Sequence, residues 1–561
     1  MAFLSSAPLS GNTLVNALLS GTRWVSTPTT PLTYGFPIRP LEEFRYSADS
    51  LFLSSQFVPV GQVQQQAIRH ILEGDSPFGS AGFLSYGEVE SLAAIAIDEA
   101  QFALPDIRFN ITAASTTADG FYRDRSGGGD VWFNFAANVA APTPGNGAWL
   151  VHLHNTLHAL GLKHPNDAVS GNAAVLPANF DSLEFTVMSL RSVAGAAPGY
   201  TSETWGFPQT PMVLDIQALQ HLYGPNYRTN AEDTRYSWSP TTGEMSVNGV
   251  GQGAPGTNRI LLTIWDGGGT DTFDLSNYST GVSVSLEPGA ASVLSNVQLA
   301  QIGTSSGAPV LARGNVFNSL LFNGDNRAII ENAIAGGGDD WMEGNSLPNA
   351  LIGGGGNDLL FGRGGADILF GWSGNDELRG GTSDDVATGD EGNDRIFGEE
   401  GNDTANGGIG DDLLAGWLGN DQLGGGAGND FVFGEQGNDV VWGEDGDDQL
   451  DGGSDDDLLF GGAGNDVLRG DTGNDRLSGG AGADQFAFTT GWGIDTVTDG
   501  EFGAGGDRLV LIATGFSSFA QLQPNIQYDA ATDFTNVWIN GASVIRLQGN
   551  VTLTSADILF A

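Results

Sequence analysis

The sequence has no cysteine, one lysine (Lys163) and only 21 basic residues against 67 acidic ones. The absence of cysteine excludes disulfides and thiolate metal sites, and it fits a secreted protein that needs no oxidative folding. A net charge of −46 argues against nucleic acid and anionic membranes as partners and favours cations. No run of about 18 apolar residues occurs, so we predict no transmembrane span.

The two ends of the sequence bear on secretion. Met1 to Ser20 has neither a basic region nor a long apolar run, so it predicts no Sec signal peptide. Residues 555–561 place an acidic residue before a short apolar tail, which resembles the uncleaved C-terminal signal of type I secretion. A last strand of a sheet is the alternative for these residues alone. Together with the repeats described next, they favour the type I secretion machinery as a partner.

Aspartate recurs every nine residues between Asp358 and Asp484. Glycine stands two residues before the aspartate in all but two repeats, where Ser383 and Asp455 replace it, and an apolar residue stands two after it. The fifteen aspartates are Asp358, Asp367, Asp376, Asp385, Asp394, Asp403, Asp412, Asp421, Asp430, Asp439, Asp448, Asp457, Asp466, Asp475 and Asp484. The unit is similar to the GGxGxDxUx nonapeptide of the RTX family.

The repeat unit predicts a calcium-bound parallel β-roll. Its glycine-rich half forms a tight turn, its aspartate offers the oxygen ligand that Ca²⁺ prefers, and its apolar residue points into the core. Residues 336–484 carry 33 acidic residues against 5 arginines, so we expect this segment to be unfolded until calcium neutralises it.

The roll is expected to begin before the unbroken series. Asp340 lies eighteen residues before Asp358, with Asn349 at the skipped position. A separate copy, residues 265–273, reads WDGGGTDTF and resembles the first calcium loop of the serralysin β-domain. An ordinary glycine-rich hairpin is the alternative for that copy.

Three of the six histidines, His154, His158 and His164, have the spacing of metal ligands. A helix places His154 and His158 on one face because they are four residues apart. Gly161 allows the chain to leave that helix in a left-handed conformation, so that His164 can return as a third nitrogen ligand. Three nitrogens with an open fourth position are typical of catalytic zinc. His152 points away from the ligand face and is expected to be structural.

This run, HNTLHALGLKHP, resembles the metzincin signature HExxHxxGxxHP, and the run FTVMSLRS around Met188 resembles the serralysin Met-turn. The segments LTYGF at 32–36, DVWF at 130–133 and DIQALQHLYG at 215–224 agree. The resemblance to serralysins, secreted zinc proteases with a calcium-binding repeat tail, covers nearly the whole chain. It implies one zinc ion held by the three histidines above Met188.

Two departures from the serralysin pattern fall on the chemistry. Asn155 stands where the family has its general base, a glutamate, and an amide cannot accept the proton of zinc-bound water. Leu190 stands where the family's Met-turn has a tyrosine that stabilises the transition state. Loss of both groups is expected to raise the barrier by several kcal/mol.

Three functions follow from these observations. The first is a secreted pseudo-protease that binds zinc and calcium. The second is an active zinc endopeptidase in which a nearby carboxylate (Asp167, Asp181 or Glu184) serves as a relocated base. The third is a calcium-folded adhesin or surface protein whose N-terminal domain binds a peptide or protein ligand. Asn155 and Leu190 favour the first over the second.

The expected fold is α+β, with a metzincin-like N-terminal domain, a parallel β-roll and a β-sandwich C-terminal domain. We predict a metallopeptidase-like domain at 1–228, a connecting β region at 229–330, the roll at 331–490 and a capping region at 491–561. Helices are expected at 60–73, 88–101, 148–160 and 212–222, and strands at 130–135, 260–265 and 281–286.

Overall fold

The computed structural model forms two compact units. The first comprises Met1–Leu275 and Leu286–Ile330, and the second comprises Ser276–Ser285 and Glu331–Ala561. The residues that the structure describes are 3–6, 9–25, 31–37, 57–73, 93, 95, 97–100, 106–112, 120–124, 128–134, 141–169, 172–305, 307–489, 491, 493–503, 506–539 and 543–561.

A six-stranded sheet forms one layer of the first unit. Its strand order is β5-β3-β6-β8-β7, with β4 paired to β6. Strands β3, β5, β6 and β8 run parallel, whereas β7 and β4 are antiparallel to their neighbours. The bounds are β3 Leu32–Gly35, β4 Phe57–Val58, β5 Ile97–Glu99, β6 Ile107–Thr112, β7 Gly120–Asp124 and β8 Gly128–Asn134. A separate pair joins β1 Phe3–Ser6 to β2 Thr22–Val25.

Helices cover this sheet and carry the histidine run. Helix α5 (Gly147–Leu160) contacts β7, β8 and helix α3 (Gln62–Glu73), and α6 (Val213–Tyr223) contacts the short α1 (Thr13–Asn16). Asn146 caps the start of α5 by accepting a hydrogen bond from the Trp149 N–H at 2.7 Å. Gly161 ends it with a φ of 117°, the left-handed exit expected from the sequence.

Most of the expected elements of the first unit agree with the structure, and one is partly wrong. The expected helix at 88–101 contains β5 instead, because Ile97–Glu99 pairs with β3 in the parallel sheet. Residues 88–92, 94, 96 and 101 lie outside the described residues. The β-branched Ile95 and Ile97 are both buried, and two-residue alternation of buried positions is the periodicity of a strand.

Short strands complete the first unit. The expected strand at 260–265 corresponds to β12, which pairs with β18. The bounds are β9 Arg235–Trp238, β10 Met245–Val247, β11 Val250–Gly251, β12 Leu262–Ile264, β13 Thr272–Asp274, β15 Ala291–Ser292, β16 Gln301–Ser305, β17 Ala308–Leu311 and β18 Val316–Asn318, with the 3-10 helix η2 at Asn326–Ala328.

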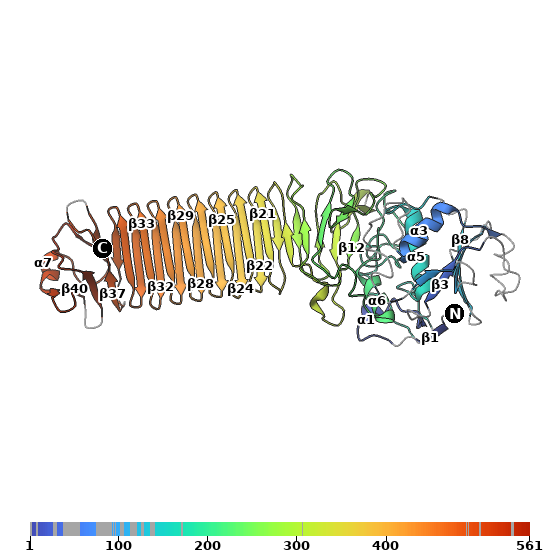
Figure 1. Cartoon of the computed structure of the whole chain (residues 1–561), viewed down its shortest axis with the longest axis horizontal. Helices are drawn as coiled ribbons and strands as arrows, with labels where there is room; N and C mark the ends of the chain where they lie inside the picture. Colours follow the sequence, from blue (N-terminus) through green and yellow to red (C-terminus); the bar gives the residue numbers. More distant parts are fainter. Residues whose placement is uncertain are drawn as a thin grey trace. The chain divides into compact units, whose positions relative to one another are not determined.

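The second unit is a parallel β-roll in which successive strands alternate between two sheets (Figure 1). Each paired residue in the repeats lies 18 positions, or two repeats, from its partner, as in Leu351 with Leu369. One sheet contains β19 Asn332–Ile334, β21 Ala350–Gly355, β23 Ile368–Ser373, β25 Val386–Glu391, β27 Thr404–Ile409, β29 Gln422–Ala427, β31 Val440–Asp445, β33 Leu458–Ala463, β35 Arg476–Ala481 and β37 Ile494–Val497. The other contains β14 Ser283–Ser285, β20 Trp341–Glu343, β22 Leu359–Gly364, β24 Glu377–Thr382, β26 Arg395–Glu400, β28 Leu413–Leu418, β30 Phe431–Gln436, β32 Gln449–Ser454, β34 Val467–Thr472, β36 Gln485–Phe488, β38 Arg508–Leu511 and β42 Ile558–Phe560.

The core of the roll consists of the apolar residue two positions after each aspartate. These side chains run from Leu360 to Phe486, and none is more than 5% exposed. The small members Ala387 and Ala405 lie opposite each other in neighbouring strands. Ser383 and Asp455, which replace the turn glycine, have φ values of 89° and 80°, so the left-handed turn persists without glycine. The predicted parallel β-roll is confirmed.

The C-terminal strands extend the two sheets of the roll. β37 pairs with β41 (Val544–Gln548), which continues antiparallel through β40 (Phe534–Trp538) to β39 (Ile526–Asp529). A short helix α7 (Phe519–Leu522) and the 3-10 helix η3 (Gln523–Asn525) precede β39. Residues 558–560, in the predicted secretion signal, form the strand β42 on β38. Among the described residues, every helix falls short of the length and apolar character that a membrane crossing requires.

Candidate metal centre

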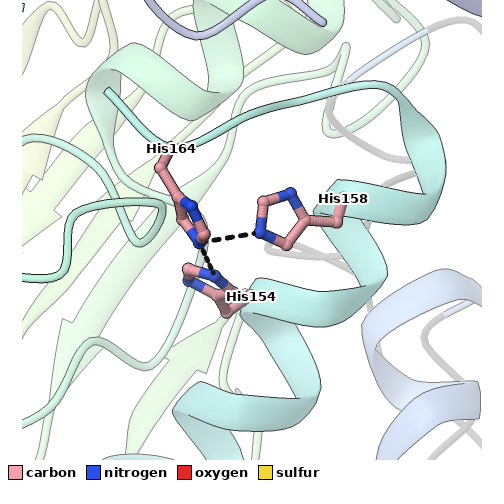
Figure 2. A group of neighbouring side chains, drawn as sticks. All are labelled: His154, His158 and His164. Carbon is pink, nitrogen blue, oxygen red and sulfur yellow. Dashed lines mark hydrogen bonds between the residues drawn. The ribbon is translucent and has the colours of Figure 1, made fainter. Parts of the chain in front are cut away.

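His154, His158 and His164 converge at the end of α5, as the sequence predicts (Figure 2). The Nε2 atom of His164 lies 3.1 Å from Nε2 of His154 and 3.1 Å from Nε2 of His158. Within the described part of the chain, these three residues are the one group of at least three His, Asp or Glu side chains placed to share a metal ion. The first two project from one face of the helix, and the third returns from the loop after Gly161.

The opposite nitrogen of each ring contacts an oxygen. Nδ1 of His154 lies 2.8 Å from the carbonyl oxygen of Val187, and Nδ1 of His158 lies 2.9 Å from that of Leu162. Nδ1 of His164 lies 2.9 Å from Oδ2 of Asp167. Because a carbonyl or carboxylate oxygen only accepts, each Nδ1 must carry the proton, which leaves the Nε2 lone pairs facing one another.

Three facing lone pairs repel one another unless a cation lies between them. Zinc bonds of 2.0–2.1 Å to nitrogen in tetrahedral geometry separate the ligand atoms by about 3.3 Å, close to the distances found here. The outer hydrogen bonds also match those that orient metal-bound histidines. The residues therefore fit a zinc ion with three protein nitrogens and one open position.

Asp215 holds the turn beneath this cluster. One of its oxygens accepts from the Thr186 hydroxyl at 2.5 Å, and the other accepts from the Val187 and Met212 N–H groups at 2.7 and 2.9 Å. Val187 in turn contacts His154, so this carboxylate supports a metal-facing ring through one intermediate. Burial raises the pKa of Asp215 to about 7 despite these three bonds. Met188, the expected Met-turn residue, is fully buried.

Burial also affects the histidines of α5. Burial lowers the pKa of His154 to about 4, with the proximity of His164 as a smaller cause in the same direction. His152 has its pKa lowered to about 4 by burial as well, and its ring stacks on Phe133 at 4.5 Å. His152 thus packs against the sheet and lies outside the histidine cluster.

The two substituted positions offer no base at the cluster. The Asn155 side chain folds back along the helix, where its Nδ2 donates to the Val151 carbonyl oxygen at 2.9 Å. Its Oδ1 is buried without a hydrogen-bond partner among the described residues. Leu190 is 43% exposed and contributes no polar side-chain atom.

The three carboxylates considered as relocated bases are engaged elsewhere. Asp167 contacts the Nδ1 side of His164, away from the metal-facing nitrogen. Asp181 accepts from Asn166, Ser189 and Arg191. Glu184 accepts from the Arg313 N–H at 2.7 Å. None of these contacts directs a carboxylate toward the Nε2 atoms.

The repeat aspartates form a second, linear set of candidate sites along the roll. Oδ1 of each accepts the N–H of the aspartate, or its equivalent, one turn earlier, as Asp421 does from Asp403 at 2.8 Å. Oδ2 of all fifteen, and of Asp340, is buried without a hydrogen-bond partner. An orphaned, buried carboxylate oxygen is costly, and a calcium ion would satisfy it.

Glycine keeps this space open. A Cβ added to Gly416 would collide with Oδ2 of Asp421, and one on Gly425 would meet both Oδ2 of Asp430 and neighbouring atoms of that side chain. At Gly407 the carbonyl oxygen of Gly425 also borders the space, 2.5 Å from the added Cβ. Carboxylate and carbonyl oxygens thus converge at each turn, which is the donor set that Ca²⁺ takes.

Without a bound cation, burial raises the pKa of the repeat aspartates. Burial raises the pKa of Asp367, Asp385 and Asp421 to about 7, and that of Asp457 to about 8. Neighbouring aspartates add to the rise at Asp457. The cation-free roll therefore disfavours the charged form that prevails at neutral pH.

The positions before the unbroken series behave differently from one another. Asp340 accepts from the Val282 N–H at 2.6 Å and leaves Oδ2 orphaned, as the repeats do. Asn349 instead donates from its Nδ2 to the carbonyl oxygen of Glu331, so this side chain already has a hydrogen-bond partner within the protein. In the separate copy, Asp271 accepts from the Thr234 N–H, and Asp266 accepts from Tyr236 and Gly268.

Sequence reasoning missed two supporting residues. Asp215 was noted only as part of a family-like run, although an acidic residue in the first turn of α6 could have identified it as a capping group. Asp167 was considered as a base, whereas its position three residues after His164 indicates a partner for that ring.

Comparisons with known proteins find a matching repeat family and several similar metalloproteases. Residues 343–497 match the family described as RTX calcium-binding nonapeptide repeat. The chain is 30% identical to Metalloprotease AprA of Pseudomonas entomophila over 40% of its length and 42% of that protein. It is 31% identical to Serralysin G of Dickeya chrysanthemi over 43% of its length and 46% of that protein, and 29% identical to Serralysin of Proteus mirabilis over 44% and 45%.

Each alignment thus spans less than half of the curated relative. Among solved structures, extracellular lipase LipA from Serratia marcescens covers 44% of each chain at 16% identity with a TM-score of 0.14, a likeness too low to support a conclusion. The chain therefore carries RTX calcium-binding repeats and is similar, over about two fifths of its length, to serralysin metalloproteases.

Proposed function

We propose that this chain is a secreted, calcium-folded RTX protein whose N-terminal unit retains a serralysin-type zinc site without the protease activity. The observation that carries the proposal is the pairing of an intact ligand set with a missing base. Nε2 of His164 lies 3.1 Å from Nε2 of both His154 and His158, while the adjacent Asn155 turns back to Val151.

The chain's own residues would bind and orient the zinc ion without completing hydrolysis. The oxygens of Val187, Leu162 and Asp167 hold the Nδ1 protons, so that Nε2 of each ring stays available. When bound, zinc supplies Lewis acidity and acidifies a water molecule. General-base catalysis contributes roughly 10²–10⁴-fold to a rate, and neither Asn155 nor Leu190 can supply it.

Calcium would act in the second unit as a folding ligand. The orphaned Oδ2 atoms and the bordering glycine carbonyls support binding at each turn. Outside the cell, where calcium is abundant, binding would contribute folding free energy. Secretion through the type I machinery is part of the proposal and rests on the repeats and on the acidic–apolar end at 557–561.

Metal analysis tests the zinc site first. The protein dialysed against trace zinc in calcium buffer should retain about one zinc per chain, as a three-nitrogen site predicts. His158→Ala should lose it, and His152→Ala, a matched histidine of the same helix outside the cluster, should keep it. Absence of zinc from folded protein would overturn the proposal.

A gain-of-function variant tests the loss of catalysis. Asn155→Glu combined with Leu190→Tyr should raise casein cleavage by at least about 10²-fold, the lower end of a general-base contribution. Asn155→Gln with Leu190→Phe has matched size without the carboxylate and the hydroxyl, and it should stay inactive. A double variant that binds zinc, keeps its calcium-dependent fold and gains no activity would show that the defect lies elsewhere.

A further inference from the structure

An aromatic surface lies on the outer face of one sheet of the roll, over strands β26, β28 and β30. Alternate residues of a strand face outward, so β28 presents Leu413 and Trp417 and β30 presents Phe431, Phe433 and Glu435. Trp417 is 53% exposed and Phe431 is 43% exposed. We call the outward side chains of β28 and β30 the Trp417 face.

The neighbouring strands show how this sheet covers an exposed ring. The guanidinium of Arg379 lies 5.0 Å from the ring centre of Phe397, and that of Arg395 lies 5.7 Å from it. Glu377 binds Arg379 at 2.6 Å, and Glu399 contacts it at 3.7 Å. An aromatic ring, two carboxylates and a guanidinium therefore form one arrangement.

Trp417 lies two residues beyond the register of Phe397, whose partner in β28 is Ala415. Trp417 is paired in register with Glu399 on one side and Glu435 on the other, at strand spacings of about 4.8 Å. In the described part of the chain, no arginine or lysine is placed over the rings of Trp417 or Phe433. Glu399 already contacts Arg379, so the face offers the carboxylate of Glu435 and an indole ring over which no cation of the described residues lies.

The backbone of this row adds a cost. Glu399, Trp417 and Glu435 have φ values of 77°, 78° and 77°, a left-handed conformation that costs an L-residue roughly 1–2 kcal/mol. Glycine occupies the same register in the flanking strands, at Gly381 and Gly453. About half of the Trp417 surface faces water, so this side chain packs only partly against the roll to offset the backbone cost.

We propose that the Trp417 face docks an arginine-bearing segment of a partner polypeptide, with a guanidinium over the indole of Trp417 and its N–H groups directed to the carboxylate of Glu435. Charge complementarity supports this occupant, because the chain carries a net charge of −46 and attracts basic partners. The inference is independent of the zinc site, since it depends only on the second unit.

Fluorescence anisotropy of the calcium-loaded full chain tests the proposal. The probe is a fluorescein-labelled peptide of alternating arginine and serine, and its matched control replaces each arginine with citrulline, a neutral isostere. The arginine peptide should bind and weaken at raised ionic strength, whereas the citrulline peptide should bind at least 10-fold more weakly. Equal binding of the two peptides would overturn the proposal.

Variants locate the site. Trp417→Gly should weaken binding at least 10-fold and Glu435→Gln about 3-fold, while neither lowers the calcium-dependent melting temperature, since glycine suits this backbone position. The matched control is Trp372→Gly, because Trp372 is 54% exposed with a φ of 76° on the other sheet. Its affinity should stay within twofold of the original. Equal losses for both tryptophans, or unchanged affinity in Trp417→Gly, would contradict the site.

Sedimentation of the chain without peptide distinguishes a foreign partner from self-association of the chain, which is the main alternative. A monomer that stays monomeric over the tested concentrations agrees with a foreign partner. A dimer that Trp417→Gly dissociates would show that a second copy of the chain covers this face, and it would overturn the proposal.

Discussion

The two candidate metal regions are built in opposite ways. In the roll, every ligand repeats at nine-residue spacing, and each buried Oδ2 is orphaned within its own turn. At the histidine cluster, the ligands come from one helix and one loop, and supporting oxygens come from Val187, Leu162 and Asp167. We expect the first region to depend on its cation for folding, whereas the second is held by the hydrophobic core around α5.

This difference means that a substitution in one region need not disturb the other. A substitution at Asn155 should leave the fold intact because α5 is packed through Leu150, Leu153 and Leu157. A comparable loss in the roll leaves a buried carboxylate or a missing ligand inside the stack. We therefore expect substitutions at the histidine cluster to lower the folding stability little and substitutions of the repeat aspartates to lower it strongly.

Removal of calcium should have the largest effect and should separate the two regions. With a calcium-selective chelator, amides of residues 350–484 should lose hydrogen-exchange protection by several orders of magnitude, because the uncompensated carboxylates favour the unfolded chain. Amides of α5 should stay protected. Simultaneous loss of protection in both regions, or protection retained in the roll, would show that the two regions do not differ in their dependence on calcium. Magnesium should restore little, since it demands tight octahedral geometry.

Asp215→Ala should affect only the first unit. It leaves the Thr186 hydroxyl and the Val187 and Met212 N–H groups without an acceptor, so we expect a loss of about 3 kcal/mol in the unfolding free energy. Chemical denaturation followed by near-ultraviolet circular dichroism measures this loss. Glu232→Ala, which removes an exposed carboxylate of the same unit, should change it by less than about 0.5 kcal/mol. A shifted calcium midpoint in Asp215→Ala would count against separate units.

Acid should act on the two regions with opposite signs when metals are chelated. Burial raises the pKa of Asp367 and Asp421 to about 7, so the folded roll binds protons more tightly than the unfolded chain. Its stability should therefore increase as the pH falls from 8 toward 4. Burial lowers the pKa of His70, His152 and His154 to about 4. These three groups outweigh the single raised pKa of Asp215, so the first unit should lose stability over the same range. Far-ultraviolet circular dichroism in chelator should show β-structure returning near pH 5, and a roll that is equally unfolded at pH 5 and 8 would contradict this.

Asp167→Asn should have the smallest effect. Its carboxylate orients His164 from outside the cluster, and loss of such a partner weakens metal binding by roughly 10–100-fold. Competition with a chromophoric zinc chelator measures the change. The calcium response should stay the same, and unchanged zinc affinity would indicate that Asp167 merely lies near the ring.

The roll could be predicted from the sequence almost completely, because its period, its turn positions and its buried residues are all local. The histidine ligands could also be predicted, since the positions of His154, His158 and Gly161 follow from the geometry of a helix and its end. The roles of Asp215 and Asp167 were not, because they depend on which atoms a tertiary fold brings together. The sequence predicts helix at Ile97–Glu99 for the same reason: pairing with β3 overrides local propensity.

The most direct test of the account is casein cleavage by the unaltered chain, loaded with one zinc and folded with excess calcium. We predict no cleavage above the chelated control, in protein whose zinc content and hydrogen-exchange protection of the roll confirm that both regions are formed. Robust cleavage that a zinc chelator abolishes and added zinc restores would contradict it, and would show that a base other than Asn155 completes the site.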